Sequence, residues 1–417
     1  MVKKSDQQKD KKKKAHKRGH GEGTIYQRPD GRWTAQATIG RDSEGKPKRV
    51  TYYGKTRPEV LEKLDKARAE LKAGTFVANT KMSVSQWIAT WLETYAKPRV
   101  RLSTFESYQA LLTQHVTPVI GGIYLKDLRP EHLQKLVNQK LEYGRINKKG
   151  GLSARTVRYI LALIGQVLKQ ALKEGLVNRN VADSVSKPKR KQHEIVPLTI
   201  DQTNSFLNAA RDSRHFPAFL LEWATGLRRG ELLGLRWKDV DLKKGAISVR
   251  QSLIRTKSQG LTFTEPKTKK SRRTIPIPQE ALTELKAHKA RQNQEKLLLG
   301  GETIDGVYVP NYKDNDLVFC RGDGLPMDPR GFTKAFDLIL SKAGLPKVAF
   351  HDMRHGHATM LLLLGEHPKV VQERLGHSTI TMTLDTYSHI LPGLQEKASS
   401  KLSTVLDIKE KPSHQEG

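Results

Sequence analysis

The chain has 417 residues, with 74 lysines and arginines against 43 aspartates and glutamates, so its formal net charge is +31. Such a charge favours a polyanionic partner, because binding along a nucleic acid releases condensed counterions. The single cysteine, Cys320, excludes an intramolecular disulfide and a cysteine-based zinc site, and no apolar run approaches the roughly 20 residues of a membrane span.

The N-terminal residues 1–20 are expected to form a disordered basic tail, because residues 3–18 offer almost no apolar side chain to offset the entropy of ordering. This tail has two open interpretations, a solvated extension or an arm that follows DNA. The N-terminus also lacks the apolar core of a signal peptide, and a lone cysteine favours a reducing compartment. We therefore expect an intracellular protein without a membrane partner.

Residues 21–75 read as a small β-sheet followed by a helix. Three β-type runs at 23–26, 32–39 and 48–53 are separated by turn-forming residues at 29–31 and 42–45. A helix is predicted from Pro58 to about Lys72, with Gly74 as its stop. The strands carry arginines and lysines between aromatic residues, and a small basic sheet of this kind can lie in a major groove of DNA. A scaffold with a solvated charged face is the alternative.

Residues 80–182 show helical periodicity throughout and predict a domain of four or five helices. Ser83 and Ser153 are credible N-caps, and apolar stripes such as Trp87 and Trp91 indicate a core. A polar, basic linker follows at 186–197. Residues 195–402 then predict a larger, mostly helical domain with one β region near 246–249 and 272–277, and 403–417 a C-terminal tail. The fold class is thus multidomain and mainly α, with small β parts.

Cleavage of DNA by a side-chain hydroxyl needs a nucleophile, positive donors around the phosphate oxygens and an acid for the departing oxygen. Tyr387 lies in a short polar stretch where a phenol can stay accessible, although a lone tyrosine is usually half-buried structure. Arg228 and Glu231 share a helix face, so the carboxylate can orient the guanidinium. His351 and Arg354 have the same spacing. Each pair alone is an ordinary helix surface motif.

Two further histidines belong to the same helical segment. His357 falls on the side of apolar neighbours, which favours a structural role. For His355 a supporting role and a surface role stay open.

Taken together, four segments closely resemble the tyrosine recombinases, specifically the integrases of phages and conjugative elements. They are TGLRRGEL (225–232), HDMRH (351–355), LGH (375–377) and DTYSH (385–389). The order, the spacing and the residue types all agree with that family. The resemblance covers nearly the whole chain. Residues 21–75 look like the small, arm-type DNA-binding domain of longer integrases, 80–182 like the family's helical, SAM-like core-binding domain, and 195–402 like its catalytic domain.

The resemblance implies a catalytic role for six residues. Tyr387 matches the nucleophile that forms a 3′-phosphotyrosyl link and frees a 5′ hydroxyl. Arg228 and Arg354 match the arginines on the scissile phosphate, His351 a base or proton relay, and His377 a donor to the phosphate. The family's leaving-group acid is a lysine on a β-hairpin, here expected at 263–276. Lys267 is the best match, with Lys269 and Lys270 beside it.

The resemblance also implies partners and conditions. Family members cut double-stranded DNA attachment sites as a homotetramer, excise with an accessory protein, and need neither a metal nor another cofactor. A C-terminal segment, here 391–406, often docks on a neighbouring subunit. The implied location is the cytoplasm of a bacterial host, at the nucleoid. The implied function is integration and excision of a phage or mobile element.

Two alternatives stand beside this enzymatic reading. A type IB topoisomerase shares the catalytic constellation and relaxes supercoils, but does not need the additional basic N-terminal domain. A non-catalytic DNA-binding protein of the same fold would bind DNA without cleaving it.

Overall fold

A computed structural model describes residues 24–41, 44–72, 81–147, 149–189, 197–266, 272–304, 307–377, 379–381, 399–400 and 402–403. The expected basic tail at 1–20 and the expected C-terminal segment at 391–406 fall outside these residues, except for four positions. The chain divides into two compact units, 1–191 and 192–417. None of the helices in the described part has the length and apolar character needed to span a bilayer.

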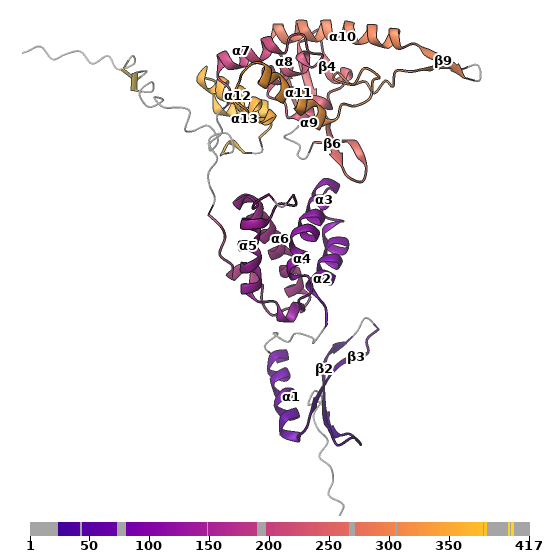
Figure 1. Ribbon diagram of the computed structural model, residues 1–417, viewed down its shortest axis with the longest axis vertical. Helices are drawn as coiled ribbons and strands as arrows, with labels where there is room; N and C mark the ends of the chain where they lie inside the picture. Colours follow the sequence, from indigo (N-terminus) through magenta and orange to yellow (C-terminus); the bar gives the residue numbers. More distant parts are fainter. Residues whose placement is uncertain are drawn as a thin grey trace, which may run out of the picture. The chain divides into compact units, whose positions relative to one another are not determined.

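The first unit begins with a three-stranded antiparallel sheet and one helix, the arrangement predicted for residues 21–75. The strands are β1 (Thr24–Gln27), β2 (Trp33–Arg41) and β3 (Pro47–Gly54), in the order β1-β2-β3. Helix α1 (Arg57–Lys72) packs against β2, as Figure 1 shows. Its buried Val60 and Leu64 lie against Ala35 and Ala37, so the sheet has one apolar face.

Residues 81–189 form a helical bundle with a single apolar core. The long helices are α2 (Val84–Trp91), α3 (Leu102–Leu111), α5 (Pro130–Tyr143) and α6 (Ala154–Lys173). Shorter turns are η1 (Leu92–Ala96), η2 (Leu112–Val116), α4 (Thr117–Ile120), η3 (Leu125–Asp127) and η4 (Val181–Ser184). The Ser83 and Ser153 hydroxyls accept from Gln86 N and Thr156 N, so both predicted N-caps are confirmed.

The second unit surrounds an aromatic core with helices. The helices are α7 (Ile200–Ala209), α8 (Phe216–Thr225), α9 (Arg229–Leu233), η5 (Trp237–Asp239), α10 (Gln279–Leu299), α11 (Pro329–Lys342), α12 (Phe350–Leu363) and α13 (Pro368–Leu375). The rings of Phe206, Phe219, Phe332, Phe336 and Phe350 lie within 6.4 Å of one another in successive pairs. Phe219 of α8 and Phe350 of α12 belong to this core, so it holds α12 next to the helix that leads into the 226–228 turn.

Small antiparallel sheets complete the second unit. The β region expected near 246–249 and 272–277 is confirmed, whereas the pairing of the strand at 260–264 differs from expectation. The strands are β4 (Val240–Asp241), β5 (Ala246–Val249), β6 (Ser252–Thr256), β7 (Gly260–Thr264), β8 (Arg273–Pro276), β9 (Gly301–Ile304) and β10 (Val307–Pro310). We expected residues 263–276 to form a hairpin. Instead β7 pairs with β6 and β8 pairs with β5, because Gly260 adopts the left-handed conformation that closes a tight turn at the upstream position.

Candidate active site

The turn between α8 and α9 begins at Gly226 and brings Arg228 to the N-terminus of α9. Gly226 has a φ of 64°, and a Cβ atom there would lie 2.7 Å from both the His357 ring and the Leu375 side chain. Only glycine combines this backbone conformation with so close an approach. The TGLR segment is therefore a tight joint between α8, α12 and the end of α13.

Arg228 is held by the carboxylate one turn further along. Its Nη1 donates to Glu231 Oε1 at 2.8 Å and its backbone N–H to Oε2 at 3.1 Å, while Nη2 donates to the Gly376 carbonyl at 3.3 Å. Burial raises the pKa of Glu231, but the guanidiniums of Arg273 and Arg228 outweigh that effect and hold it below its usual value. The carboxylate is thus ionised and orients Arg228, as the spacing indicated.

Arg354 lies almost wholly inside the protein, with 2% of its surface exposed. Its Nη1 donates to the Gly226 carbonyl and its Nη2 to the Leu375 carbonyl, both at 2.6 Å. The guanidinium fork therefore bridges the two turns that precede Arg228 and His377. Since the planar fork has a rigid geometry, these two bonds fix its orientation.

His351 sits one helical turn before Arg354 on α12. His351 keeps an exposed edge, yet the surrounding protein partly desolvates its ring, and this desolvation, then the neighbouring His355, Arg354 and Arg228, lower its pKa to about 4. The ring is therefore neutral near pH 7 and can accept a proton. The ring of His355 packs at 5.1 Å against that of His351 in a T-shaped contact, which gives His355 the supporting role that the sequence left open.

His377 follows the left-handed Gly376 at the end of α13. Its backbone is tied to Gln372, whose carbonyl accepts from the His377 N–H and whose amide donates to the His377 carbonyl, each at 3.0 Å. Burial, then Arg354 and Arg228 lower the pKa of His377 to about 4. A neutral imidazole is a hydrogen-bond donor at one nitrogen, as the predicted role requires.

His357 has the structural role that its apolar neighbours indicated. Its Nδ1–H donates to the Trp223 carbonyl at 2.7 Å, and its Nε2 accepts from Arg374 Nε at 3.2 Å. Burial and the Arg374 charge lower its pKa to about 3, which keeps the ring in this neutral form. His357 thereby joins α12 to α8 and α13 from behind the site.

The structure brings four of the six predicted catalytic residues together. Arg228, His351, Arg354 and His377 converge from α8–α9, α12 and the end of α13, and both arginines lower the pKa of both histidines. Lys267 and Tyr387 lie outside the described residues. Among the described residues no group of three histidine, cysteine or acidic side chains could hold a metal ion.

Sequence reasoning missed two arginines that support this cluster. Arg273 donates to both oxygens of Glu231, and Arg374 donates to the Ala224 and Pro276 carbonyls as well as to His357. Neither has a signal in the sequence, since burial is what separates them from the solvated arginines around them.

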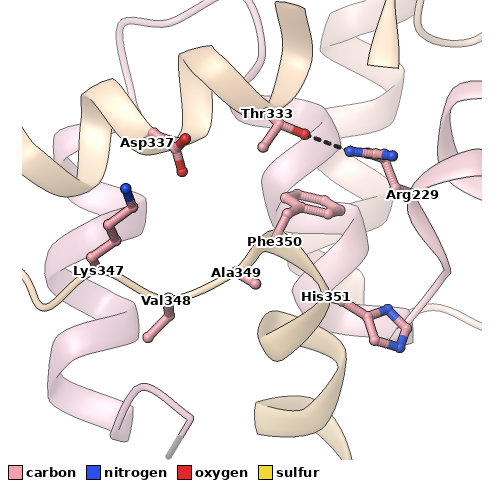
Figure 2. Close-up of a pocket in the computed structure, with 8 residues that line it drawn as sticks. All are labelled: Arg229, Thr333, Asp337, Lys347, Val348, Ala349, Phe350 and His351. Atoms are coloured by element: carbon pink, nitrogen blue, oxygen red, sulfur yellow. Dashed lines mark hydrogen bonds between the residues drawn. The ribbon is translucent and has the colours of Figure 1, made fainter. Parts of the chain in front are cut away.

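A cavity of about 710 Å³ opens beside His351, between α11 and the start of α12. Figure 2 shows Arg229, Lys347 and the His351 ring along its rim, with Arg229 hydrogen-bonded to Thr333. The lining is mixed, because Asp337 lies in the same cavity as the basic Arg229 and Lys347.

Two family models match the chain. The model described as the phage integrase family matches residues 197–393, and that of the phage integrase N-terminal SAM-like domain matches residues 83–141. The chain belongs to the tyrosine recombinase, or phage integrase, family. All four quoted motifs lie within the first of these matches.

Similar proteins share most of this integrase's length. A tyrosine recombinase XerC-like protein of Caldanaerobacter subterraneus is 29% identical over 88% of this chain and 95% of its own. The ICEBs1 integrase of Bacillus subtilis is 26% identical over 92% of this chain and 100% of its own.

Solved structures agree on the fold. The Tn1549 transposon integrase in complex with a circular intermediate DNA has a TM-score of 0.61, at 25% identity over 78% of this chain and 100% of that one. A lambda integrase tetramer bound to a Holliday junction has a TM-score of 0.53 at 18% identity, over 89% and 96% of the two chains. The integrase is thus a site-specific recombinase of phages or integrative elements, an enzyme that cleaves and rejoins DNA.

Proposed function

We propose that this recombinase cuts each strand through Tyr387. The phenol oxygen attacks phosphorus and forms a 3′-phosphotyrosyl link, while the bond from phosphorus to the 5′ oxygen breaks. His351 takes the phenol proton, directly or as a relay, and Lys267 gives a proton to the departing 5′ oxygen. The convergence of Arg228, Arg354 and two neutral imidazoles carries this proposal, since it supplies every group except the nucleophile and the acid.

Arg228 and Arg354 bind the non-bridging oxygens of the scissile phosphate, and His377 donates a further hydrogen bond. Pre-oriented donors stabilise charge where it develops, and a buried site strengthens them. The two arginines are linked through neighbouring carbonyls of the 226 and 375–376 turns, so they meet a phosphate as one rigid cradle. The covalent link conserves the energy of the broken bond, so rejoining needs neither ATP nor a metal.

The domain division follows the same proposal. Residues 80–182 and 195–402 clamp the core of an attachment site, and residues 21–75 bind a second class of site. The active assembly is a homotetramer on two DNA molecules, with the 391–406 segment docked on a neighbouring subunit. An accessory protein directs excision, and the work is done at the nucleoid of a bacterial host.

The test is a recombination reaction between two DNA molecules that carry the ends of the source element. The wild type is expected to give joined products, whereas Tyr387→Phe binds the sites and joins no strands. Tyr143→Phe, at an exposed tyrosine on α5, is the matched control and should recombine normally. Joining by Tyr387→Phe would overturn the proposed nucleophile. Relaxation of supercoils without joined products would assign topoisomerase activity instead.

A further inference from the structure

We propose that Arg273 is a positioning residue for the phosphate cradle, acting on Arg228 through Glu231 and on the 375–377 turn through the Arg374 carbonyl. This role rests on the proposed function of Arg228. It concerns a residue that does not itself touch the DNA.

Arg273 is the first residue of β8 and is almost fully enclosed, with 7% of its side chain exposed. Its Nη2 donates to Glu231 Oε2 at 2.9 Å and its Nη1 to Oε1 at 3.3 Å. Its Nε donates to the Arg374 carbonyl at 2.6 Å. The guanidinium therefore uses three separate nitrogens to join the start of α9 to the end of α13.

Glu231 is shared between two unequal partners. Arg273 is buried and belongs to a strand paired with β5, where it stands opposite the buried Val249. Arg228, by contrast, has 36% of its side chain exposed and faces the site. The paired contact with Arg273 fixes the plane of the carboxylate, and the carboxylate in turn fixes Arg228. Arg273 is thus the fixed member of a series of contacts that leads through Glu231 to Arg228.

Arg273 also contacts the turn before His377. Gly376 has a φ of 66°, and a Cβ atom there would lie 3.1 Å from the Arg273 Cδ and Nη1 atoms. The backbone of the LGH turn therefore lies directly on the Arg273 side chain. Since Arg228 also donates to the Gly376 carbonyl at 3.3 Å, a shift of Arg273 moves both Arg228 and the turn.

A purely structural role would leave a different signature. Removing one partner of a buried ion pair costs stability, although Arg273→Gln leaves Arg228 as the remaining partner of Glu231. Arg273 has a further electrostatic effect, since its charge is among those that lower the pKa of His377. In variants that remain folded, we therefore expect its loss to slow the charge-stabilising step at the phosphate and to leave DNA affinity little changed.

The test measures the rate of covalent adduct formation on a nicked attachment site by Arg273→Gln and Arg273→Lys. Arg272→Gln is the matched control, because Arg272 is 55% exposed and pairs with Glu265 on the surface. Misplacement of a reacting group by about 1 Å can cost roughly 100-fold in rate, and Arg273→Gln should slow the adduct by about that factor. DNA affinity should stay within about 3-fold of the wild type, because the buried Arg273 does not itself touch the DNA. The rate of the Arg272→Gln control should also stay within about 3-fold, because the Arg272–Glu265 pair lies on the surface.

Two modified substrates distinguish an effect on phosphate binding by Arg228 from an effect on protonation of the leaving group. A methylphosphonate at the cleavage site removes the charge that Arg228 neutralises, so the difference between wild type and Arg273→Gln should shrink to below about 10-fold. A 5′-phosphorothiolate has a leaving group that needs no proton, and it should leave the difference unchanged. Rescue by the phosphorothiolate alone would overturn the proposal, because Arg273 would then act on leaving-group protonation.

Thermal melting shows whether the variants are folded. If Arg273→Gln does not fold, the rate of adduct formation is measured on Arg273→Lys instead, because this variant keeps the positive charge and loses the planar guanidinium. A folded variant with the wild-type rate would overturn the role of Arg273 alone. Failure of the wild type to form an adduct through Tyr387 would instead overturn the proposed function.

Discussion

The guanidinium of Arg354 donates to the carbonyl oxygen of Gly226 at 2.6 Å. This bond joins the middle of α12 to the turn that leads into Arg228, across 128 positions of the chain. The two arginines proposed to bind the scissile phosphate are therefore parts of one framework. A substitution of either arginine should therefore alter the position of the other.

Arg354→Lys tests this framework. A lysine supplies one ammonium and cannot bridge the Gly226 and Leu375 carbonyls as the planar fork does. We expect adduct formation to fall by at least about 100-fold, because a pre-oriented donor at the phosphate is lost. Adduct formation is followed on nicked DNA together with the melting temperature, and a folded Arg354→Lys protein with wild-type activity would refute the assignment.

The lowered pKa of His357 predicts that the folded protein loses stability as the pH falls. Its pKa is lowered from 6.5 to about 3 in the folded protein, so the unfolded chain takes up a proton first as the pH falls. The stability that comes from the neutral ring is complete above pH 6.5 and is lost as the pH falls towards 3. By about pH 5 the loss is about 2 kcal/mol.

His357→Gln removes this titration, so its free energy of unfolding should change less between about pH 7 and pH 5 than that of the wild type. His351 and His377 have the same sign of shift and leave a residual slope in both proteins. Denaturant unfolding at the two pH values measures the difference. Equal slopes for variant and wild type would show that His357 is not the titrating group.

The helical bundle of residues 81–189 has a cavity lined by basic side chains, which we predict to contact the DNA backbone. Arg155, Arg158, Tyr159 and Lys187 line a cavity of about 580 Å³ on α6. Arg155→Ala is expected to weaken DNA binding and to reduce the slope of log affinity against log salt by about 1. Lys135→Ala, at a 78% exposed side chain on α5, is the control and should leave the slope unchanged. An unaltered slope in both would place the duplex elsewhere.

Deletion of residues 1–74 tests the arm-type domain. The sheet of β1–β3 with α1 has its own small core, in which Val60 and Leu64 are fully buried, so its removal should not disturb the catalytic unit. We expect cleavage at isolated core sites to persist, while assembly on a full attachment site weakens in gel-shift experiments. Unchanged recombination by the truncated protein would assign this region to a scaffold.

Much of this fold could be predicted from the sequence, because local signals such as helix caps and residue spacing agree with the structure. Ser83 and Ser153 cap their helices, and the spacing of Arg228 and Glu231 does place them on one face. The strand pairing around 252–276 was not predictable, because short β-runs leave the choice of partner to tertiary packing. Arg273 was missed for a similar reason, since nothing local separates it from the exposed Arg272. The assignments of Lys267 and Tyr387 remain predictions.

In the proposed reaction, Tyr387 becomes joined to DNA in the phosphate cradle of Arg228 and Arg354. The most direct measurement incubates the wild type with nicked attachment-site DNA in chelator, quenches with detergent and digests the adduct for mass spectrometry. We predict a nucleotide on the peptide that contains Tyr387, and none in Tyr387→Phe. A nucleotide on another residue, or no adduct on verified cognate sites, would show that Tyr387 is not the nucleophile.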